Sequence, residues 1–468
     1  MSLRRLEPLL TLLLAVAVAV ASAQISYRMQ PVVPLILGAG IGGLAIAFWK
    51  PMWTLYAAIL AIPLELVSLK FGSFGLSPGE GLFLLAGFAW VARRLAAGQR
   101  PWTPTTLGKP YTLLLLAAVP GFAIVSDQFL VWKLLIMWTA FFFVFEMVAT
   151  EGDERTVRNI LFALAVAGGI VGAIAIGGAA GNEPQLIGTG EAATGRAQGS
   201  FGHPNTLATF LGLALPGALA IGLLGRPTWR PAALAAFAAM IVALALSLSR
   251  GGLLAVAGAL GIMLAWAPFR RATLVAVVLV AVLYAAGAQP LGGSQQVSTV
   301  EQRVQSISSS SQGVNPRFGI WRKAPGIALD AMPFGVGANN FPNIAPRYGL
   351  LDPQQLPYDH AHNIPLTFLI ERGIAALVAL IWATVAFVRL LIIGYRRGDQ
   401  ARKGLVLAIG AAIFALALQG MLDYTLRANV LVALIFTLVG CAAVLARTAE
   451  SESQPPATAE PVPAATAA

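Results

Sequence analysis

The chain has 468 residues, of which 57% are hydrophobic and only 11% are charged, and its formal net charge is +11 at pH 7. A soluble chain of this length would carry many more charges on its surface, so the composition excludes a string of soluble domains and indicates one integral membrane unit. The single cysteine excludes a disulfide framework and a cysteine-based metal site. The positive charge is typical of cytoplasmic loops in a membrane protein, so we expect membrane lipids and no nucleic acid among the partners.

The first 23 residues carry two basic residues, then an apolar stretch, then Ala21-Ser22-Ala23. This pattern fits both a cleavable signal peptide and an uncleaved first membrane span. We favour the span because further apolar runs follow at once. Both alternatives place Gln24 outside the cytoplasm.

Apolar runs of the length that crosses a bilayer recur along the chain and predict an all-α, polytopic membrane protein with roughly 12–14 transmembrane helices. The run at 51–68 contains Pro63 and Glu65, so a re-entrant loop is the alternative there. The runs lie near residues 6–23, 31–49, 51–68, 81–97, 110–126, 130–149, 159–178, 205–224, 231–248, 252–268, 272–288, 362–388, 404–421 and 428–446.

Pairs of basic residues mark the short loops on one side of these runs, for example Arg93–Arg94, Arg270–Arg271 and Arg396–Arg397. The positive-inside rule assigns that side to the cytoplasm. Both long connections, 179–204 and 289–361, then lie on the outer face. We therefore expect a multi-pass protein of the cytoplasmic (inner) membrane with an active site that faces the periplasm or the cell exterior.

Polar segments gather on this predicted outer face. Two of the three histidines lie in one of them, at the start of an apolar run, and ionisable groups at a water–lipid boundary are costly to keep and therefore indicate function. The segments are GRAQGSFGHPN (195–205), SLSRGG (247–252), NPRFGIWRKA (315–324) and GVGANNF…YDHAHN (335–363).

Arg250 lies in a tight turn between two predicted spans, so its charge must be at the outer interface. Two interpretations stay open. The guanidinium group can clamp an anion, because its fork of donors matches phosphate oxygens. Alternatively, Arg250 extends to lipid headgroups or pairs with Asp423.

Taken in order, the four segments resemble the O-antigen ligase and polymerase superfamily of lipid-linked glycan transferases. That family has an Arg–Gly–Asn segment before a span, a Ser-Arg-Gly turn two spans later, and a long outer loop that ends in His-Asn. In its pattern the His-Asn pair is followed nine residues later by Gly, as His362-Asn363 is here by Gly373. Ala376 departs from the last position of the pattern, which weakens assignment to the ligases proper more than to the superfamily.

The resemblance implies a GT-C-like helical fold and an enzyme that moves a glycan from a polyprenyl-diphosphate carrier to a hydroxyl group of a glycan or lipid–glycan acceptor. It places the essential histidine on His362 and the arginines that contact the diphosphate on Arg250 and Arg317. Imidazole, with a pKa of about 6.5, suits removal of the hydroxyl proton. Arginines suit the charge that develops on the leaving group. We therefore expect no metal and no other cofactor.

Five further residues are substrate-binding candidates because they lie in the same segments. Asn205 is also a candidate cap of the helix that follows it, with His203 as a loop residue. The candidates are Arg196, Asn205, Arg322, His360 and Asn363.

His360 has a second interpretation. His-x-His can place two imidazoles on one side of an extended segment, where Asp359 could complete a metal site. The loop carries no other histidine, so we favour a supporting role for His360.

Other functions stay open at this stage. An O-antigen or exopolysaccharide polymerase and a protein O-oligosaccharyltransferase differ from a ligase only in the acceptor. A transporter or flippase of lipid-linked glycans is the alternative of another class. Transporters often show inverted repeats and sites at mid-membrane, whereas SRGG and HAHN occur once each and lie at one predicted surface.

The chain divides on these grounds into four parts. Residues 1–189 form N-terminal transmembrane helices, and 190–390 form an O-antigen ligase-like catalytic region that includes the outer loop 289–361. Residues 391–447 form C-terminal transmembrane helices. The Pro- and Ala-rich residues 448–468 predict a disordered cytoplasmic tail.

Overall fold

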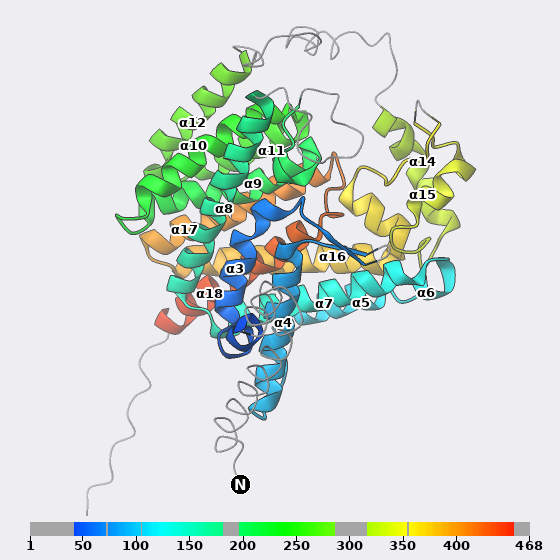
Figure 1. Cartoon of the computed structure of the whole chain (residues 1–468), viewed down its shortest axis with the longest axis horizontal. Coiled ribbons are helices and arrows are strands. Elements are labelled where there is room, and N and C mark those ends of the chain that lie inside the picture. The colour runs from blue at the N-terminus through cyan, green and yellow to red at the C-terminus, as the bar shows by residue number, and fades with distance from the viewer. Residues whose placement is uncertain are drawn as a thin grey trace, which may run out of the picture.

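The computed structural model describes residues 42–71, 74–103, 105–180, 196–285, 316–352 and 355–453 (Figure 1). These residues are almost entirely helical, and their strands form one small antiparallel hairpin of β1 (Leu69–Phe71) and β2 (Phe74–Leu76). The all-α prediction is confirmed. The labelled helices are α3 (Pro51–Leu60), η1 (Ile62–Leu64), α4 (Pro78–Ala96), α5 (Gly108–Leu116), α6 (Gly121–Ile124), α7 (Gln128–Glu151), α8 (Glu154–Ala180), η3 (Gly199–Phe201), α9 (Pro204–Leu224), α10 (Arg230–Ser247), α11 (Arg250–Leu264), α12 (Ala267–Ala285), α14 (Pro316–Asp330), α15 (Phe341–Ile344), η4 (Ala345–Tyr348), α16 (Ile364–Arg397), α17 (Gln400–Gly420) and α18 (Asn429–Ser453).

Seven helices of the described residues are long and apolar enough to cross a membrane, which confirms a polytopic membrane protein. They are α7, α8, α9, α10, α16, α17 and α18. An eighth span results if the helix Gly42–Trp49 and α3, which meet at a bend of 118°, are counted as one.

The described residues thus hold fewer spans than the 12–14 we expected. The predicted run at 6–23 and most of the run at 31–49 lie outside the described residues. Other runs are shorter or broken: the run at 110–126 divides into α5 and α6 beside Pro120, and α11 has 15 residues. Hydropathy records the apolar length of a run but not where its helix bends or ends, and proline favours such breaks.

The helix α9 lies at the centre of the membrane bundle. It is apolar on every side and buried along nearly its whole length, packed between α8, α10, α11 and α17. Small residues also let the helices around α9 approach one another closely, as is common for helices packed in a membrane. On α8, for example, a Cβ atom at Gly172 would lie 3.1 Å from the backbone of Ala239 on α10.

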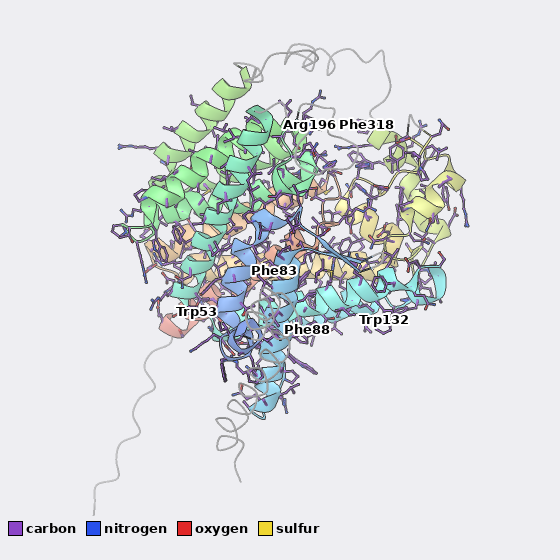
Figure 2. The ribbon with its side chains drawn as sticks, in the orientation of Figure 1. Trp53, Phe83, Phe88, Trp132, Arg196 and Phe318 are labelled. Carbon is purple, nitrogen blue, oxygen red and sulfur yellow. The ribbon has the colours of Figure 1, made fainter. Side chains whose placement is uncertain are left out.

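Large apolar side chains also cover the outside of the molecule. Phe83 is fully buried between α4 and α7, whereas Trp53, Phe88 and Trp132 are exposed on α3, α4 and α7 (Figure 2). Exposed rings of this size on helices of spanning length are expected where lipid tails, not water, surround the protein.

The second half of the predicted outer loop is folded. Helices α14, α15 and η4 enclose a small core of their own around Ile320, Ile327 and Phe341, and this core packs on Ile370 at the start of α16. Figure 1 shows this unit in yellow at one end of α16. We call residues 316–361 the outer subdomain.

Helix α16 is broken at Gly373, where the backbone has a φ of 73°. The outer subdomain inserts into the break, because the amides of Val336 and Gly337 donate to the carbonyls of Ile370 and Glu371 at 2.8 and 2.9 Å. A Cβ atom at Gly373 would overlap the carbonyl group of Pro333. The conformation and the contact both require glycine at this position of the sequence pattern.

The last helix continues past the predicted end of the membrane region. We expected disorder from residue 448, but α18 extends to Ser453. Arg402 explains the extra turns, because its guanidinium group donates to both carboxylate oxygens of Glu452 at 2.8 and 2.9 Å. The rest of the predicted tail lies outside the described residues.

Candidate functional site

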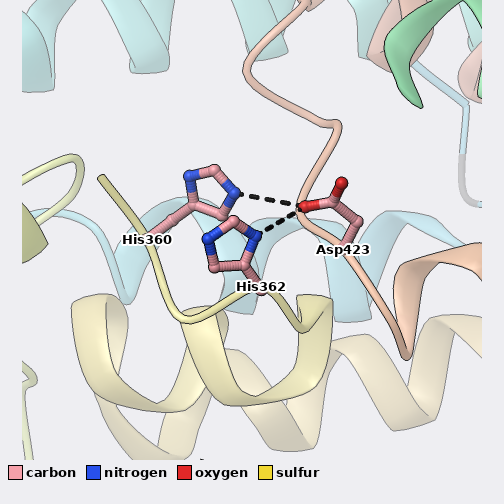
Figure 3. Close-up of side chains that lie close together, drawn as sticks. All are labelled: His360, His362 and Asp423. Carbon is pink, nitrogen blue, oxygen red and sulfur yellow. Dashed lines mark hydrogen bonds and ion pairs between the residues drawn. The ribbon is translucent and has the colours of Figure 1, made fainter. Parts of the chain in front are cut away.

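A buried aspartate in the short connection between α17 and α18 joins the predicted site residues. Asp423 Oδ1 lies 2.9 Å from His362 Nδ1 and 3.3 Å from His360 Nε2 (Figure 3). Its second oxygen, Oδ2, accepts from Asn205 Nδ2 at 2.5 Å and faces Arg317 Nη2 at 3.5 Å. We call these five residues the Asp423 cluster.

The carboxylate of Asp423 is held in its ionised form. Burial alone would raise its pKa, but the hydrogen bonds from His360 and His362, and the positive charge of Arg317, hold the pKa of Asp423 well below its usual range. Burial lowers the pKa of His360, although the hydrogen bond to Asp423 opposes this shift. The site therefore combines a neutral His360 with an ionised Asp423.

Asn205 links the cluster to two further segments. Its Oδ1 accepts from Arg196 Nη2 at 3.3 Å and from Ser249 Oγ at 2.9 Å. Arg196 also donates from Nε to the carbonyl of Ser247 at 3.0 Å. The segments 195–205 and 247–252 are thus brought together as predicted, and both connect to Asp423 through one amide side chain.

The starts of four helices meet at this point. Helices α9, α11 and α16 are capped by His203, Ser249 and Asn363, and α14 begins one residue before Arg317. The N-terminal end of a helix carries a partial positive charge and unsatisfied N–H donors. Their convergence beside three arginine-bearing segments favours an anion.

Two predicted arginines lie outside the Asp423 cluster. Arg250 is the first residue of α11, directly after Ser249, and its side chain is exposed. Arg322 is exposed on α14, a little over one turn beyond Arg317. Neither is among the groups that bond to Asp423, so the alternative pairing of Arg250 with Asp423 is replaced by the pairing of Arg317. Contact of Arg250 and Arg322 with substrate stays a prediction.

The predicted cap of α9 was wrong. His203, not Asn205, is the N-cap residue, and its Nδ1 accepts from the amide of Asn205 at 3.1 Å. The side chain of Asn205 is free of capping because Pro204 and His203 satisfy the start of the helix, and it reaches Asp423 instead.

Asn363 positions the histidine segment. Its Oδ1 accepts from the amide of Leu366 at 2.9 Å and its Nδ2 donates to the carbonyl of Met421 at 2.9 Å. These bonds tie the start of α16 to the α17–α18 connection. Asn363 therefore has a positioning role, and its contact with substrate stays a prediction.

His362 itself is held in an uncommon backbone conformation, with a φ of 49°. Non-glycine residues at positive φ are found where surrounding structure enforces them, often at functional sites. Here Trp321 on α14 donates from Nε1 to the carbonyl of Ala361 at 2.9 Å, and the ring of Tyr358 meets that of His362 edge-on. The outer subdomain thus fixes the direction of the imidazole.

A metal-ligand set exists at the site, but with a different carboxylate from the one we considered. His360, His362 and Asp423 each offer one ligand atom, and these atoms lie within 4.8 Å of one another. Asp359 instead forms an ion pair with Arg427 at 2.7 Å, and 63% of its side chain is exposed.

Sequence reasoning named Asp423 only as a possible partner of Arg250 and missed its central place. The available signal was an acidic residue between two apolar runs, where a charge is costly without a partner. Glu65 and Glu80, also near the predicted outer face, are both satisfied by Ser77: the hydroxyl donates to Glu65 at 2.7 Å and the amide donates to Glu80 at 3.0 Å.

Comparison with known families identifies the central part of the chain. Residues 235–381 match the family model described as O-antigen ligase. The matched segment starts in α10, includes Arg250, Arg317 and His362, and ends beyond the break at Gly373. No curated protein matches the chain. The match agrees with the order of motifs and with their meeting at Asp423, and it supports the predicted resemblance to the O-antigen ligase superfamily over this part of the chain.

Proposed function

We propose that this protein is a glycosyltransferase that moves a glycan from a polyprenyl-diphosphate carrier to an acceptor hydroxyl on the outer face of the cytoplasmic membrane. The observation that carries the proposal is the pairing of His362 with Asp423 among arginines and helix starts. The family match over residues 235–381 supports an enzyme of the ligase or polymerase type.

His362 acts as the general base. When its Nδ1–H donates to Asp423, the other ring nitrogen, Nε2, carries the lone pair. The acceptor hydroxyl oxygen forms a bond to the anomeric carbon of the donor sugar, and its proton passes to His362 Nε2. A base positioned in this way contributes about 10²–10⁴-fold to the rate. Asp423 stays ionised and stabilises the imidazolium that forms.

The leaving group is the carrier diphosphate. The bond between the anomeric carbon and the phosphate oxygen breaks, and its electron pair remains on the diphosphate. Arg317 is positioned to stabilise this charge, with Arg250 and Arg196 at the starts of the neighbouring segments. Preorganised donors of this kind are worth about 3–4 kcal/mol each in the transition state. The step needs no metal ion.

The location of the site supports an outer-face reaction. The Asp423 cluster lies at the ends of α16, α17 and α18 that the positive-inside rule assigns to the outer side, whereas the paired basic residues Arg396 and Arg397 lie at the far end of α16. A lipid-linked donor would present its diphosphate at this level of the bilayer.

Deletion of the gene, followed by mass spectrometry of carrier lipids and surface glycans, tests the proposal and separates its forms. Full-length glycan that accumulates on the carrier indicates a ligase, and single repeat units on the carrier indicate a polymerase. Unchanged carrier lipids and unchanged surface glycans would contradict the proposal.

A further inference from the structure

The two histidines and the aspartate of the cluster also have the composition of a transition-metal site. We propose that His360, His362 and Asp423 bind a divalent ion such as Zn²⁺, and that the bound ion inhibits glycan transfer. The inhibitory part rests on the proposed function, whereas the binding part stands on the geometry alone.

The spacing of the three ligand atoms fits a small tetrahedral ion. Zinc binds imidazole nitrogen and carboxylate oxygen at about 2.0–2.2 Å, which separates neighbouring ligand atoms by about 3.4 Å. Asp423 Oδ1 is already 3.3 Å from His360 Nε2 and 2.9 Å from His362 Nδ1. Shifts of a few tenths of an ångström suffice at these two contacts. The two imidazole nitrogens, which lie within 4.8 Å of each other, must also approach to about 3.4 Å to complete the set. Two imidazoles favour Zn²⁺ over Mg²⁺ or Ca²⁺.

The ligand oxygen is held in place by bonds that a metal ion would not break. Asn205 and Arg317 engage the opposite oxygen, Oδ2, at 2.5 and 3.5 Å. The amide of Tyr424 donates to Oδ1 at 2.9 Å. Outer contacts that fix a ligand in this way strengthen a metal site, and they leave a fourth position for water or a phosphate oxygen.

Metal binding and base catalysis require opposite tautomers of His362. A metal ion on Nδ1 replaces the hydrogen bond to Asp423 and leaves the ring proton on Nε2. The nitrogen that must accept the proton of the acceptor hydroxyl then has no lone pair. The same ion also takes up the carboxylate that stabilises the imidazolium, so occupancy of the site stops transfer.

His360 is the residue that turns the His362–Asp423 pair into a three-ligand metal site. His362 and Asp423 alone provide two ligands, and His360 supplies the third from two residues away, with the two rings 4.2 Å apart between centroids. Asp359 gives a matched control, because it is an acidic neighbour on the same segment that pairs with Arg427 and is not one of the three ligands.

Titration of the purified full-length protein with Co²⁺, in metal-free detergent buffer, tests the binding part. We expect one ion per chain, visible absorption bands of tetrahedral cobalt, and displacement by Zn²⁺. Affinity should fall at least about tenfold in His360→Ala, His360→Gln and Asp423→Asn, and should not change in Asp359→Asn. Absence of saturable binding, or equal affinity in the His360 variants that elute as folded protein, would overturn the site.

Transfer from a lipid-linked donor tests the inhibitory part. We expect Zn²⁺ to inhibit the wild type, EDTA to restore it, and His360→Ala to be at least about tenfold less sensitive relative to its own rate without zinc. Stimulation by Zn²⁺ would overturn the inference. If the protein binds cobalt as expected but transfers no glycan, the metal site is supported and the proposed function is contradicted.

Discussion

The membrane bundle and the Asp423 cluster are held together in different ways. Around α9 the contacts are apolar and close, and small residues such as Gly172 decide how near two helices lie. At the Asp423 cluster, three other chain segments are joined by hydrogen bonds and an ion pair to a single carboxylate. A change in the bundle should therefore alter stability, and a change in the cluster should alter chemistry while the protein still folds.

Among the residues that support His362, Asp423 should have the largest effect on chemistry when it is changed, as in Asp423→Asn. The amide keeps the size of the side chain but can donate to His362 Nδ1, which selects the tautomer without a basic Nε2. We expect transfer to fall about 10³–10⁴-fold, as when the aspartate of a catalytic histidine is made an amide. The measurement is transfer from lipid-linked donor in membranes.

The control for this substitution is Asp359→Asn, because Asp359 is exposed and forms an ion pair with Arg427, which is itself exposed. It should retain transfer within about twofold, since exposed ion pairs contribute little. Equal losses in the two variants would show that the carboxylate of Asp423 has no special place in the reaction.

Two substitutions of Arg317 distinguish the effect of its positive charge from the effect of its planar donor geometry. Arg317→Ala should lower kcat about 10²–10³-fold, the loss expected for one donor to a developing negative charge. Arg317→Lys should recover part of this loss, because it keeps the charge without the planar fork. Identical kcat in both variants and the wild type would remove Arg317 from the leaving-group site.

The bundle should respond in the opposite way. A Cβ atom at Gly87 on α4 would overlap the carbonyl oxygen of Ala140 on α7, whereas a Cβ atom at Gly261 on α11 would meet nothing within 4 Å. We expect Gly87→Ala to destabilise the protein by about 1–3 kcal/mol. Gly261→Ala should leave stability unchanged or raise it slightly, because alanine favours a helix.

Thermal unfolding in detergent measures both glycine variants. Transfer per folded molecule should stay near the wild-type value in each of them. A fall in turnover without a fall in the midpoint of unfolding would show that bundle and cluster are coupled more tightly than their contacts indicate.

The sequence predicts the membrane bundle better than it predicts the Asp423 cluster. Apolar runs predicted the helical membrane fold, and the resemblance predicted that His362, Arg250 and Arg317 lie together. The structure joins His362 and Arg317 through Asp423, whereas Arg250 is not among the groups that bond to Asp423. The hydrogen-bond network around Asp423 could not be predicted from the sequence. Asp423 is 61 residues from His362, and the hairpin of α16 and α17 brings them into contact. His203 caps α9 while Asn205 bonds to Asp423, which lies in the α17–α18 connection, so this arrangement also depends on a residue far along the chain.

The smallest effect is expected at Glu65, beside η1. Burial raises the pKa of Glu65 to about 8, helped by the charge of Glu80 and opposed by the hydrogen bond from Ser77. A raised pKa in the folded state means that the protonated form stabilises the protein. This contribution is full below the ordinary pKa of about 4.5 and is lost as the pH rises through about 8.

Glu65→Gln should therefore reduce the loss of thermal stability between about pH 6 and about pH 9, and by less than any change above. The midpoint of unfolding at the two pH values checks this for wild type and variant. An equal decline in both would show that Glu65 does not titrate in this range.

The central claim is that the imidazole of His362, oriented by Asp423, removes the proton of the acceptor hydroxyl. The most direct measurement is the turnover of His362→Ala, purified in folded form, with a lipid-linked glycan donor and its acceptor. We predict a loss of at least about 10²-fold, within the range for removal of a general base, while donor binding persists. Turnover equal to that of the wild type would contradict the account.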